Sequence, residues 1–205
     1  MADICYIIGA GDVAATDILA DKSDYIICAD GGYKYKNLLG RECDMVVGDF
    51  DSLGSVPECD NKIVAPTEKD ETDMMLAVNL GYDKGYRNFV IFGALGGARN
   101  DHSVANIQLL HYIASKGAKG TLYHGDEVFT AFSDGTISLG AENKGYVSVF
   151  SLSEESRGVT IENLKYNLEK ATLYSYMPIG VSNEFLGKEA RITVDDGTLL
   201  VVYKR

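Results

Sequence analysis

Hydrophobic and polar residues follow different patterns in the two halves of the chain. In the first half, continuous apolar runs bounded by glycine, proline or polar residues are typical of buried parallel strands. They are Cys5–Ile8, Tyr25–Ala29, Met45–Val47, Lys62–Ala65 and Asn88–Phe92. From Thr121 onward, apolar and polar residues alternate instead, as in Tyr146–Phe150. Such alternation predicts antiparallel strands with one buried face.

The segments between these runs complete the predicted fold. In the second half, Asp195–Gly197 predicts a hairpin turn. Helices are expected to be opened by Asp12, to cover Tyr33–Leu39, to begin in the acidic segment Thr67–Asp73, and to cover Ser103–Lys116. We therefore expect an N-terminal Rossmann-like α/β domain with a mainly parallel sheet over residues 1–119. A C-terminal antiparallel β-sandwich is expected over residues 120–205.

Composition and charge narrow the possible partners. The chain has 205 residues, is 46% hydrophobic and carries a net charge of −11, which fits a globular protein and disfavours binding to a nucleic-acid backbone. No basic segment precedes the first apolar run, and no apolar run reaches the ~20 residues of a membrane span. The cysteines are scattered without a CxxC pair. We expect a cytoplasmic protein with reduced thiols that binds neither nucleic acid nor membrane.

Two carboxylates follow the Met45–Val47 run closely. Asp49 and Asp51 are two residues apart, and an extended chain directs such side chains to the same face. Two like charges at about 4 Å repel by roughly 4 kcal/mol at an effective dielectric near ~20, so the pair requires a proton or a cation. A hard divalent ion such as Mg²⁺ satisfies both carboxylates. The alternative is a solvated loop in which one aspartate forms an Asx turn.

Glycine turns follow the first two strands. Gly9 and Gly11 belong to a G-x-G-x-x-A pattern of the dinucleotide-binding kind, and Asp30 stands where a ribose-binding carboxylate is expected. An NAD-type site is therefore one hypothesis. Gly31 and Gly32 indicate a turn whose backbone N–H groups suit a phosphate or simply form a tight corner.

Two further segments carry polar side chains toward the expected carboxyl edge of the sheet, where ligands of open α/β sheets bind. Asp73 directly precedes an apolar helical run, and we expect it one to two turns into its helix. In the glycine-rich segment Gly93–His102, Arg99 can hold phosphate oxygens, and Asp101 is either a helix cap or an acid of the site. Arg99 and Asp101 equally suit a surface ion pair, and His102 alone suits a packing role.

Two segments of the second half contain side chains that are unusual for a scaffold. Tyr166 is an aromatic residue flanked by polar groups, and Ser182 and Asn183 occupy an expected turn. Ordinary strand and turn structure explains both segments as well. The residues alone therefore leave their role open.

Six short motifs resemble those of the thiamine pyrophosphokinase family. They are ADGG at Ala29–Gly32, VGDFDS at Val47–Ser52, KDETD at Lys69–Asp73, GGARNDH at Gly96–His102, LKYNL at Leu164–Leu168 and the SN pair at Ser182–Asn183. Each motif is weak alone, but their order and spacing are specific, and together they span nearly the whole chain. The resemblance implies transfer of a diphosphoryl group from ATP to the hydroxyl of thiamine, on an α/β nucleotide-binding domain followed by a β-sandwich.

The resemblance also implies which residues form the site. Those that match Asp49, Asp51 and Asp73 hold Mg²⁺ against the ATP phosphates. The resemblance also implies which residues line the pocket that holds the ATP phosphates. These are Asp30, Gly31, Gly32, Thr72, Arg99, Asp101 and His102.

A homodimer is implied in the same way. Two subunits of the family pair so that the site lies between the α/β half of one chain and the β half of its partner. Tyr166, Ser182 and Asn183 would then contact thiamine in the partner's site. Many members carry Trp where this chain has Tyr166, and Tyr keeps a flat face for stacking on a cationic heterocycle.

The implied chemistry is in-line attack of the thiamine hydroxyl on the β-phosphorus of ATP, which releases AMP. Mg²⁺ and Arg99 would neutralise the developing charge. Asp101 and Asp73 are both candidates for accepting the hydroxyl proton. The alternatives are an NAD-type dinucleotide-binding protein, a DxD-type phosphatase with Asp49 as its nucleophile, and a non-catalytic nucleotide or thiamine sensor.

Overall fold

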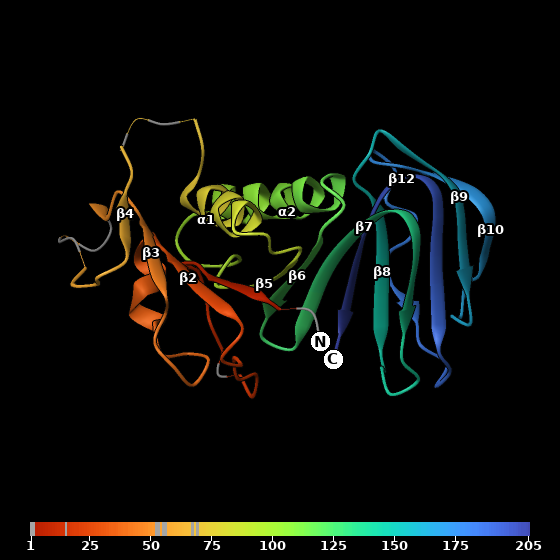
Figure 1. The fold of residues 1–205 in the computed structure, drawn as a ribbon. Coiled ribbons are helices and arrows are strands. Elements are labelled where there is room, and N and C mark those ends of the chain that lie inside the picture. The colour runs from red at the N-terminus through yellow and green to blue at the C-terminus, as the bar shows by residue number, and fades with distance from the viewer. Residues whose placement is uncertain (1–2, 15, 52–53, 55–56, 67, 69) are drawn as a thin grey trace. The chain divides into compact units, whose positions relative to one another are not determined.

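The computed structural model describes residues 3–14, 16–51, 54, 57–66, 68 and 70–205, so Ser52 and Lys69 of the motifs above lie outside the described residues. The chain forms two compact units. One consists of Met1–Leu109 with Leu122–Gly125, and the other of Leu110–Thr121 with Asp126–Arg205. Figure 1 labels most of their helices and strands. The helix α2 (Asn100–Ser115) and the strand β6 (Lys119–His124) each contribute residues to both units.

The N-terminal unit contains a parallel sheet in the order β5, β1, β2, β3, β4. Nearly all residues of its strands are buried, except in the edge strand β4, because both faces of a parallel sheet are covered. The strands are β1 (Cys5–Ile8), β2 (Tyr25–Ala29), β3 (Met45–Gly48), β4 (Lys62–Val64) and β5 (Asn88–Phe92). The apolar runs thus form the strands that they predict.

Two helices and a short 3-10 helix accompany this sheet. The 3-10 helix η1 (Asp30–Tyr35) continues directly from β2, α1 (Asp73–Asp83) precedes β5, and α2 follows it. The apolar face of α1, which includes the buried Met74 and Val78, contacts β1, β2 and β3. Among the helices of the described residues, none has both the length and the hydrophobicity of a membrane span.

The helix predicted after Gly11 is absent, since residues 12–14 and 16–20 form no helix. The N–H group of Gly11 donates to the carbonyl of Gly93 at 2.8 Å, and that of Asp12 donates to the carbonyl of Leu95 at 3.0 Å. The turn is therefore hydrogen-bonded to the loop after β5. The helix N-terminus that an NAD-type fingerprint requires is missing.

Not all of the other predicted helices begin where they are expected. The helix expected over Tyr33–Leu39 is replaced by η1, which is narrower and begins at Asp30. The helix α1 begins at Asp73, the last residue of the acidic segment in which its start is predicted, because the Thr72 hydroxyl caps it by accepting the Met75 N–H at 3.2 Å. The helix α2 begins at Asn100 instead of Ser103.

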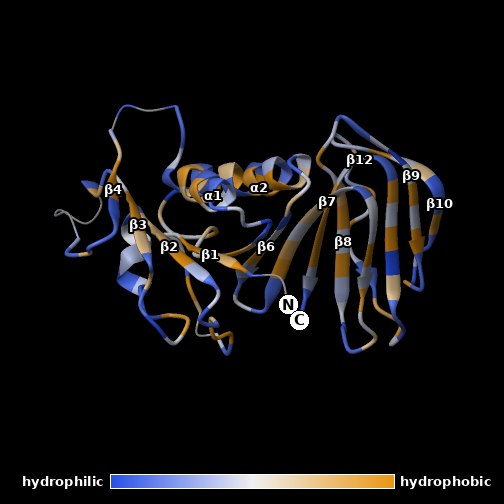
Figure 2. Cartoon of the chain, in the orientation of Figure 1, coloured by the Kyte–Doolittle hydropathy of each residue, from blue (hydrophilic) through white to orange (hydrophobic). Residues whose placement is uncertain are grey.

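The strands of the C-terminal unit pair antiparallel around one long strand, β12. Its whole length pairs with β7, its first half with β9 and its second half with β8, while β10 pairs with β9 and β11 with β8. Alternate side chains are buried, as the hydropathy bands along β8 indicate (Figure 2). The strands are β7 (Glu127–Leu139), β8 (Tyr146–Ser151), β9 (Glu155–Glu162), β10 (Leu168–Tyr174), β11 (Asn183–Glu184) and β12 (Ala190–Lys204).

The hairpin turn predicted at Asp195–Gly197 is wrong, because these residues form a bulge inside β12. The register with β7 shifts between Val194 and Thr198. Gly197 has a φ of 112°, and its N–H donates to the Asp134 carboxylate at 2.9 Å. A bulge accommodates extra residues in one strand without reversing the chain, so the strand continues to Lys204.

Candidate active site

The ends of β2 and β3 bring three aspartates together. Ala29 lies opposite Val47 in the parallel register, so Asp30 and Asp49 leave the same edge of the sheet from neighbouring strands. Carboxylate oxygens of Asp30, Asp49 and Asp51 lie within 4.8 Å of one another. At such a separation each pair of charges repels by roughly 3 kcal/mol at an effective dielectric of about 20, so the group favours a bound cation or proton.

Gly48 permits this convergence. A side chain at Gly48 would place its Cβ 3.0 Å from the Cα of Asp30 and 3.1 Å from the Cβ of Asp30, which is tighter than ordinary contacts between such atoms. Gly48 also has a φ of 151°, which residues with a side chain rarely adopt. The end of β3 can therefore approach Asp30 only because Gly48 has no side chain.

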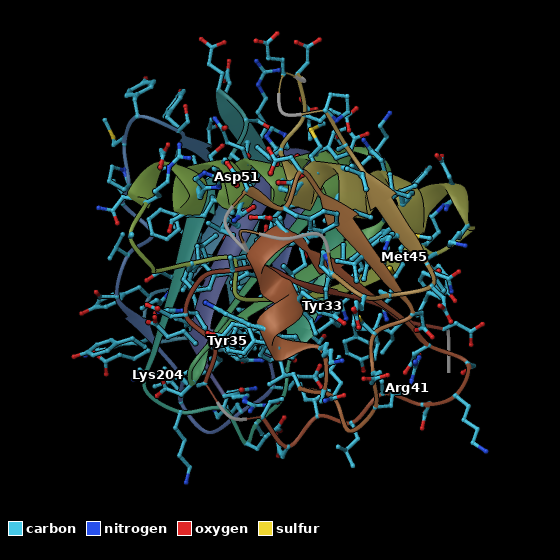
Figure 3. The ribbon with its side chains drawn as sticks, turned by 90° about the vertical axis from the view of Figure 1, so that its left-hand side faces the viewer. Tyr33, Tyr35, Arg41, Met45, Asp51 and Lys204 are labelled. Atoms are coloured by element: carbon cyan, nitrogen blue, oxygen red, sulfur yellow. The ribbon has the colours of Figure 1, made fainter. Side chains whose placement is uncertain are left out.

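Phe50 turns the backbone between the two neighbouring aspartates. Its φ is 60°, which is unusual for a bulky residue, and its ring is buried in the hydrophobic cluster of this unit. The N–H of Asp51 donates to Oδ1 of Asp49 at 3.2 Å. Asp49 and Asp51 thus converge through a turn, and the prediction that strand alternation aligns them is wrong. Figure 3 labels Met45, where β3 begins, and Asp51, at the end of the turn that follows it.

The turn after β2 packs tightly against β1. Gly31 and Gly32 are buried within η1, and a side chain at Gly32 would collide with the carbonyl of Ile8. Asp30 has a φ of 44°, the second left-handed conformation at this edge of the sheet. Strained backbone of this kind gathers at functional sites, where surrounding packing holds it in place.

Asp73 is the first residue of α1 and not one to two turns inside it. The next residue, Met74, is buried, and its sulfur would lie 2.8 Å from a Cβ placed on Gly9, the residue after β1. The start of α1 is therefore beside the carboxyl end of β1. The carboxylate of Asp73 is not a member of the close group formed by Asp30, Asp49 and Asp51.

The glycine-rich loop after β5 is fitted against the first turn of the chain. Side chains at Gly93 and Gly96 would collide with the backbone of Gly9 and the carboxylate of Asp12, respectively. The buried Asn106 of α2 donates to the carbonyl of Ala94 at 2.7 Å and fixes the loop. The glycines of both segments therefore serve packing, and the loop holds Arg99 at the start of α2.

Arg99 and Asp101 form an exposed ion pair with two hydrogen bonds, Nη2 to Oδ2 at 2.5 Å and Nε to Oδ1 at 3.3 Å. The Arg99 guanidinium lowers the pKa of Asp101. The same hydrogen bond raises the pKa of Arg99, and the negative charge of Asp51 adds to this rise. Arg99 is thus within electrostatic reach of the acidic group. His102 is exposed, so the packing role considered for it is wrong.

The candidate residues of the C-terminal unit lie together. The side-chain amide of Asn183 forms hydrogen bonds with the backbone N–H and C=O of Tyr166, at 2.9 and 2.7 Å. The Tyr166 side chain is exposed, whereas Asn183 is buried at the start of β11. Only Ser182 occupies the expected turn, with a φ of 60° and its N–H donating to Oγ of Ser148 at 3.1 Å.

A positioning role for Phe50 is absent from the sequence-based predictions. For Gly48 a signal exists, since a glycine at the end of a central strand often marks a close approach of backbone. A signal also exists for grouping Asp30 with Asp49, because both follow parallel strands and such ends share one edge. For Phe50 there is none, because a phenylalanine gives no indication of a positive φ.

Comparison with known proteins identifies the family. The models for "Thiamin pyrophosphokinase, catalytic domain" and "Thiamin pyrophosphokinase, vitamin B1 binding domain" match residues 16–122 and 136–199, respectively. A thiamine pyrophosphokinase from Bacillus subtilis (strain 168) is 30% identical over 162 residues, which cover 76% of this chain and 75% of that protein.

Solved structures agree with these matches. The crystal structure of thiamine pyrophosphokinase from Bacillus subtilis is similar with a TM-score of 0.83 and 25% identity, over 98% of this chain and 99% of that one. The thiamin pyrophosphokinase family protein from Enterococcus faecalis gives a TM-score of 0.80 and 26% identity, over 100% of this chain and 99% of that one. The chain belongs to the thiamin pyrophosphokinase family.

Proposed function

We propose that this protein transfers the diphosphoryl group of ATP to the hydroxyl group of thiamine, giving thiamine diphosphate and AMP. The close group of Asp30, Asp49 and Asp51 carries the proposal, because transfer between phosphates requires a place where cations can neutralise negative charge. Membership of the thiamin pyrophosphokinase family supports the same reaction.

We assign the two substrates to two domains. ATP binds to a Rossmann-like α/β domain over residues 1–119, which the parallel pairing of β1 to β5 supports. Thiamine binds to an antiparallel β-sandwich over residues 120–205, which the antiparallel strands around β12 support. The catalytic and vitamin B1 binding models match segments that largely follow this division, 16–122 and 136–199.

The acidic group suits Mg²⁺, which prefers oxygen ligands. With Mg–O distances of about 2.1 Å, ligand oxygens of one ion lie up to about 4 Å apart, so small side-chain movements suffice to close a group within 4.8 Å. Asp30, Asp49 and Asp51 would hold the ion, and Asp73 adds a further carboxylate from the start of α1. When bound, Mg²⁺ neutralises charge on the ATP phosphates.

The remaining residues of this edge orient ATP. Arg99 can exchange Asp101 for phosphate oxygens, since its guanidinium forms two parallel hydrogen bonds with either group. The N-terminus of α1 at Thr72 presents a partial positive charge, which favours a phosphate. We place His102 and the turn Asp30–Gly32 along the same pocket.

The reaction is a single displacement. The thiamine hydroxyl oxygen bonds to the β-phosphorus, the bond from that phosphorus to the oxygen bridging toward AMP breaks, and the hydroxyl loses its proton. Asp101 is a poor acceptor for this proton while Arg99 lowers its pKa, and a carboxylate that holds Mg²⁺, as proposed for Asp73, is a weak base too. The protein contributes mainly by positioning both substrates.

We propose a homodimer in which each thiamine is held by the C-terminal domain of the partner subunit. Tyr166 and Ser182 form the thiamine face, the buried Asn183 supports this face, and the exposed Tyr166 ring can stack on a cationic heterocycle. Exposed apolar side chains in the same unit, including Tyr176 and Ile179, support a subunit interface there.

We place the reaction in the cytoplasm. The four cysteines are free, which supports a reducing compartment. The net charge of −11 supports ATP bound through metal ions, rather than a nucleic acid, as the anionic partner.

One assay tests the proposed reaction. The purified protein is incubated with thiamine, ATP and Mg²⁺, and the products are separated by ion-exchange chromatography. AMP and thiamine diphosphate are expected in equal amounts, and neither is expected when EDTA replaces Mg²⁺. Release of ADP or free phosphate without thiamine diphosphate would overturn the proposal. Binding of a fluoride mimic of phosphate to the Asp49 carboxylate, in place of a covalent phosphoryl group, would instead favour the DxD-type phosphatase.

A further inference from the structure

The side chain of Asn183 binds both backbone groups of Tyr166. Its Oδ1 accepts the Tyr166 N–H at 2.9 Å and also the Glu184 N–H at 2.9 Å, while its Nδ2 donates to the Tyr166 carbonyl at 2.7 Å. We call these three hydrogen bonds the Asn183 clamp. Asn183 is 5% exposed, so water competes little for these hydrogen bonds. The Asn183 side chain therefore pairs both backbone groups of Tyr166, as a neighbouring strand would.

Neighbouring contacts hold the same loop between β9 and β10. The N–H of Lys165 donates to the carbonyl of Glu184 at 3.0 Å, and Leu164 forms an isolated antiparallel bridge with Phe185. Leu164 is 1% exposed and lies in the hydrophobic core of the unit. Leu164, Lys165 and Tyr166 are thus attached in succession to the segment Asn183–Phe185.

The ring of Tyr166 takes no part in these backbone hydrogen bonds. It is 60% exposed, although its backbone is held by a buried group. The Lys165 ammonium lies 5.5 Å from the ring centre and is itself paired with the Glu184 carboxylate at 2.6 Å. The loop therefore presents an aromatic ring to solvent on a backbone whose position is already fixed.

We infer that Asn183 is a positioning residue, which acts on thiamine through Tyr166. A ring held in place before the ligand arrives loses less conformational freedom on binding, so the clamp strengthens binding without touching the ligand. This inference rests on the proposed role of Tyr166 in holding thiamine. We do not assign Asn183 a direct contact with thiamine, because its side-chain amide already uses both lone pairs of Oδ1 and one N–H in hydrogen bonds with the backbone.

The chain contains no tryptophan, so Tyr166→Trp introduces a single fluorescent reporter on the loop. In that background we compare Asn183→Ala with Asn143→Ala. Asn143 is a matched control because its amide also donates to a backbone carbonyl, that of Gly140 at 3.0 Å, in a different loop of the unit. The measurements are fluorescence anisotropy and acrylamide quenching without thiamine, followed by KM and kcat for each substrate.

Asn183→Ala is expected to lower the anisotropy and increase the quenching before thiamine is added, and Asn143→Ala to change neither. The KM for thiamine should rise roughly tenfold, with the KM for ATP unchanged. Unchanged anisotropy and quenching would overturn the inference, and a raised thiamine KM in that case would indicate direct contact. If Asn183→Ala does not fold, Asn183→Asp keeps the two acceptor bonds and removes the donor, and a smaller change of the same sign is expected.

The two proposals fail in different ways. If Tyr166→Ala leaves the KM for thiamine unchanged, the thiamine face is misassigned, whatever the anisotropy shows. If Tyr166→Ala raises that KM but Asn183→Ala leaves the reporter unchanged, only the positioning role fails.

Discussion

At the residue scale, the acidic group depends on backbone conformations that cost free energy. Asp30 and Phe50 both have positive φ, and such conformations cost about 1–2 kcal/mol each for residues with a side chain. Burial of the Phe50 ring offsets this cost, since a fully buried side chain of that size contributes roughly 2–3 kcal/mol. The sequence predicts that Asp49 and Asp51 meet, but not that Asp30 joins them instead of Asp73. It also does not predict the turn between them, because φ at Phe50 depends on packing between distant segments.

Asp51→Asn should abolish turnover while the fold survives. The change removes one negative charge from the group that we propose to hold Mg²⁺, but Asp51 is exposed and its loss leaves no cavity. We expect kcat to fall by at least about 100-fold. Mg²⁺ alone should raise the thermal midpoint of the unsubstituted protein more than that of the variant. Asp60→Asn, a change at an exposed aspartate outside the group, serves as the control. Near-normal activity of Asp51→Asn would remove the metal role.

Gly48→Ala tests the close approach of β3 to Asp30. Gly85→Ala is its matched control, because Gly85 also has a positive φ, 97°, but nothing lies within 4 Å of its added Cβ. Gly85→Ala should lower the free energy of unfolding by about 1–2 kcal/mol, and Gly48→Ala should lower it further because its Cβ also presses on Asp30. Only Gly48→Ala should also weaken Mg²⁺-dependent activity, because its Cβ displaces Asp30. Equal activity of the two variants would contradict the positioning role of Gly48. Urea unfolding measures the free energy of unfolding of each variant.

At the element scale, the sequence predicts strands better than helix starts and turns. The buried run Asn88–Phe92 forms β5 with the expected bounds, because a parallel strand covered on both faces needs continuous hydrophobic residues. The helix predicted at Asp12 is not formed by residues 12–14 and 16–20, and the N–H of Asp12 is hydrogen-bonded to Leu95, a partner that is distant in sequence. Asp195–Gly197 has the composition of a hairpin turn, but pairing with β7 on both sides makes it a bulge.

Thiol reactivity should report on the stability of β1 and β2. Burial raises the pKa of Cys5 to about 12, and a hydrogen bond with Cys43 together with burial raises that of Cys28. The same hydrogen bond lowers the pKa of Cys43. With Ellman's reagent at pH 8, Cys43 and the partly exposed Cys59 should react first. Cys5 and Cys28 should react only at the rate of unfolding, and four fast thiols in the native protein would contradict the packing described for the sheet.

The raised pKa of Cys5 also fixes the sign of a pH effect. Because the folded pKa lies above the unfolded value of about 8.5, the stability contributed by the protonated thiol is complete below that pH and is lost as pH rises toward the folded value. The free energy of unfolding should therefore fall more steeply between about pH 9 and 11 in the unsubstituted protein than in Cys5→Val. Parallel curves for the two proteins would exclude this contribution.

At the scale of the whole molecule, each proposed site needs parts of two chains. The acidic residues belong to the N-terminal unit and the proposed thiamine face to the C-terminal unit. The sequence supports this arrangement only through family resemblance, because no pattern of residues within one chain specifies which copy supplies each half of a site.

Mixing two variants, each impaired in one half of the site, tests whether the site is shared, in assays at a thiamine concentration well below the KM of Tyr166→Ala. Asp51→Asn damages the ATP half and Tyr166→Ala the thiamine half. If subunits assort at random after joint unfolding and refolding, half of the dimers contain one of each, and each of these has one intact site and one doubly damaged site. About a quarter of the normal activity should therefore return. A mixture of Asp51→Asn with Asp30→Asn should stay inactive, because both changes affect the same half. If differently tagged subunits form mixed dimers and no activity returns, each site is formed within a single chain.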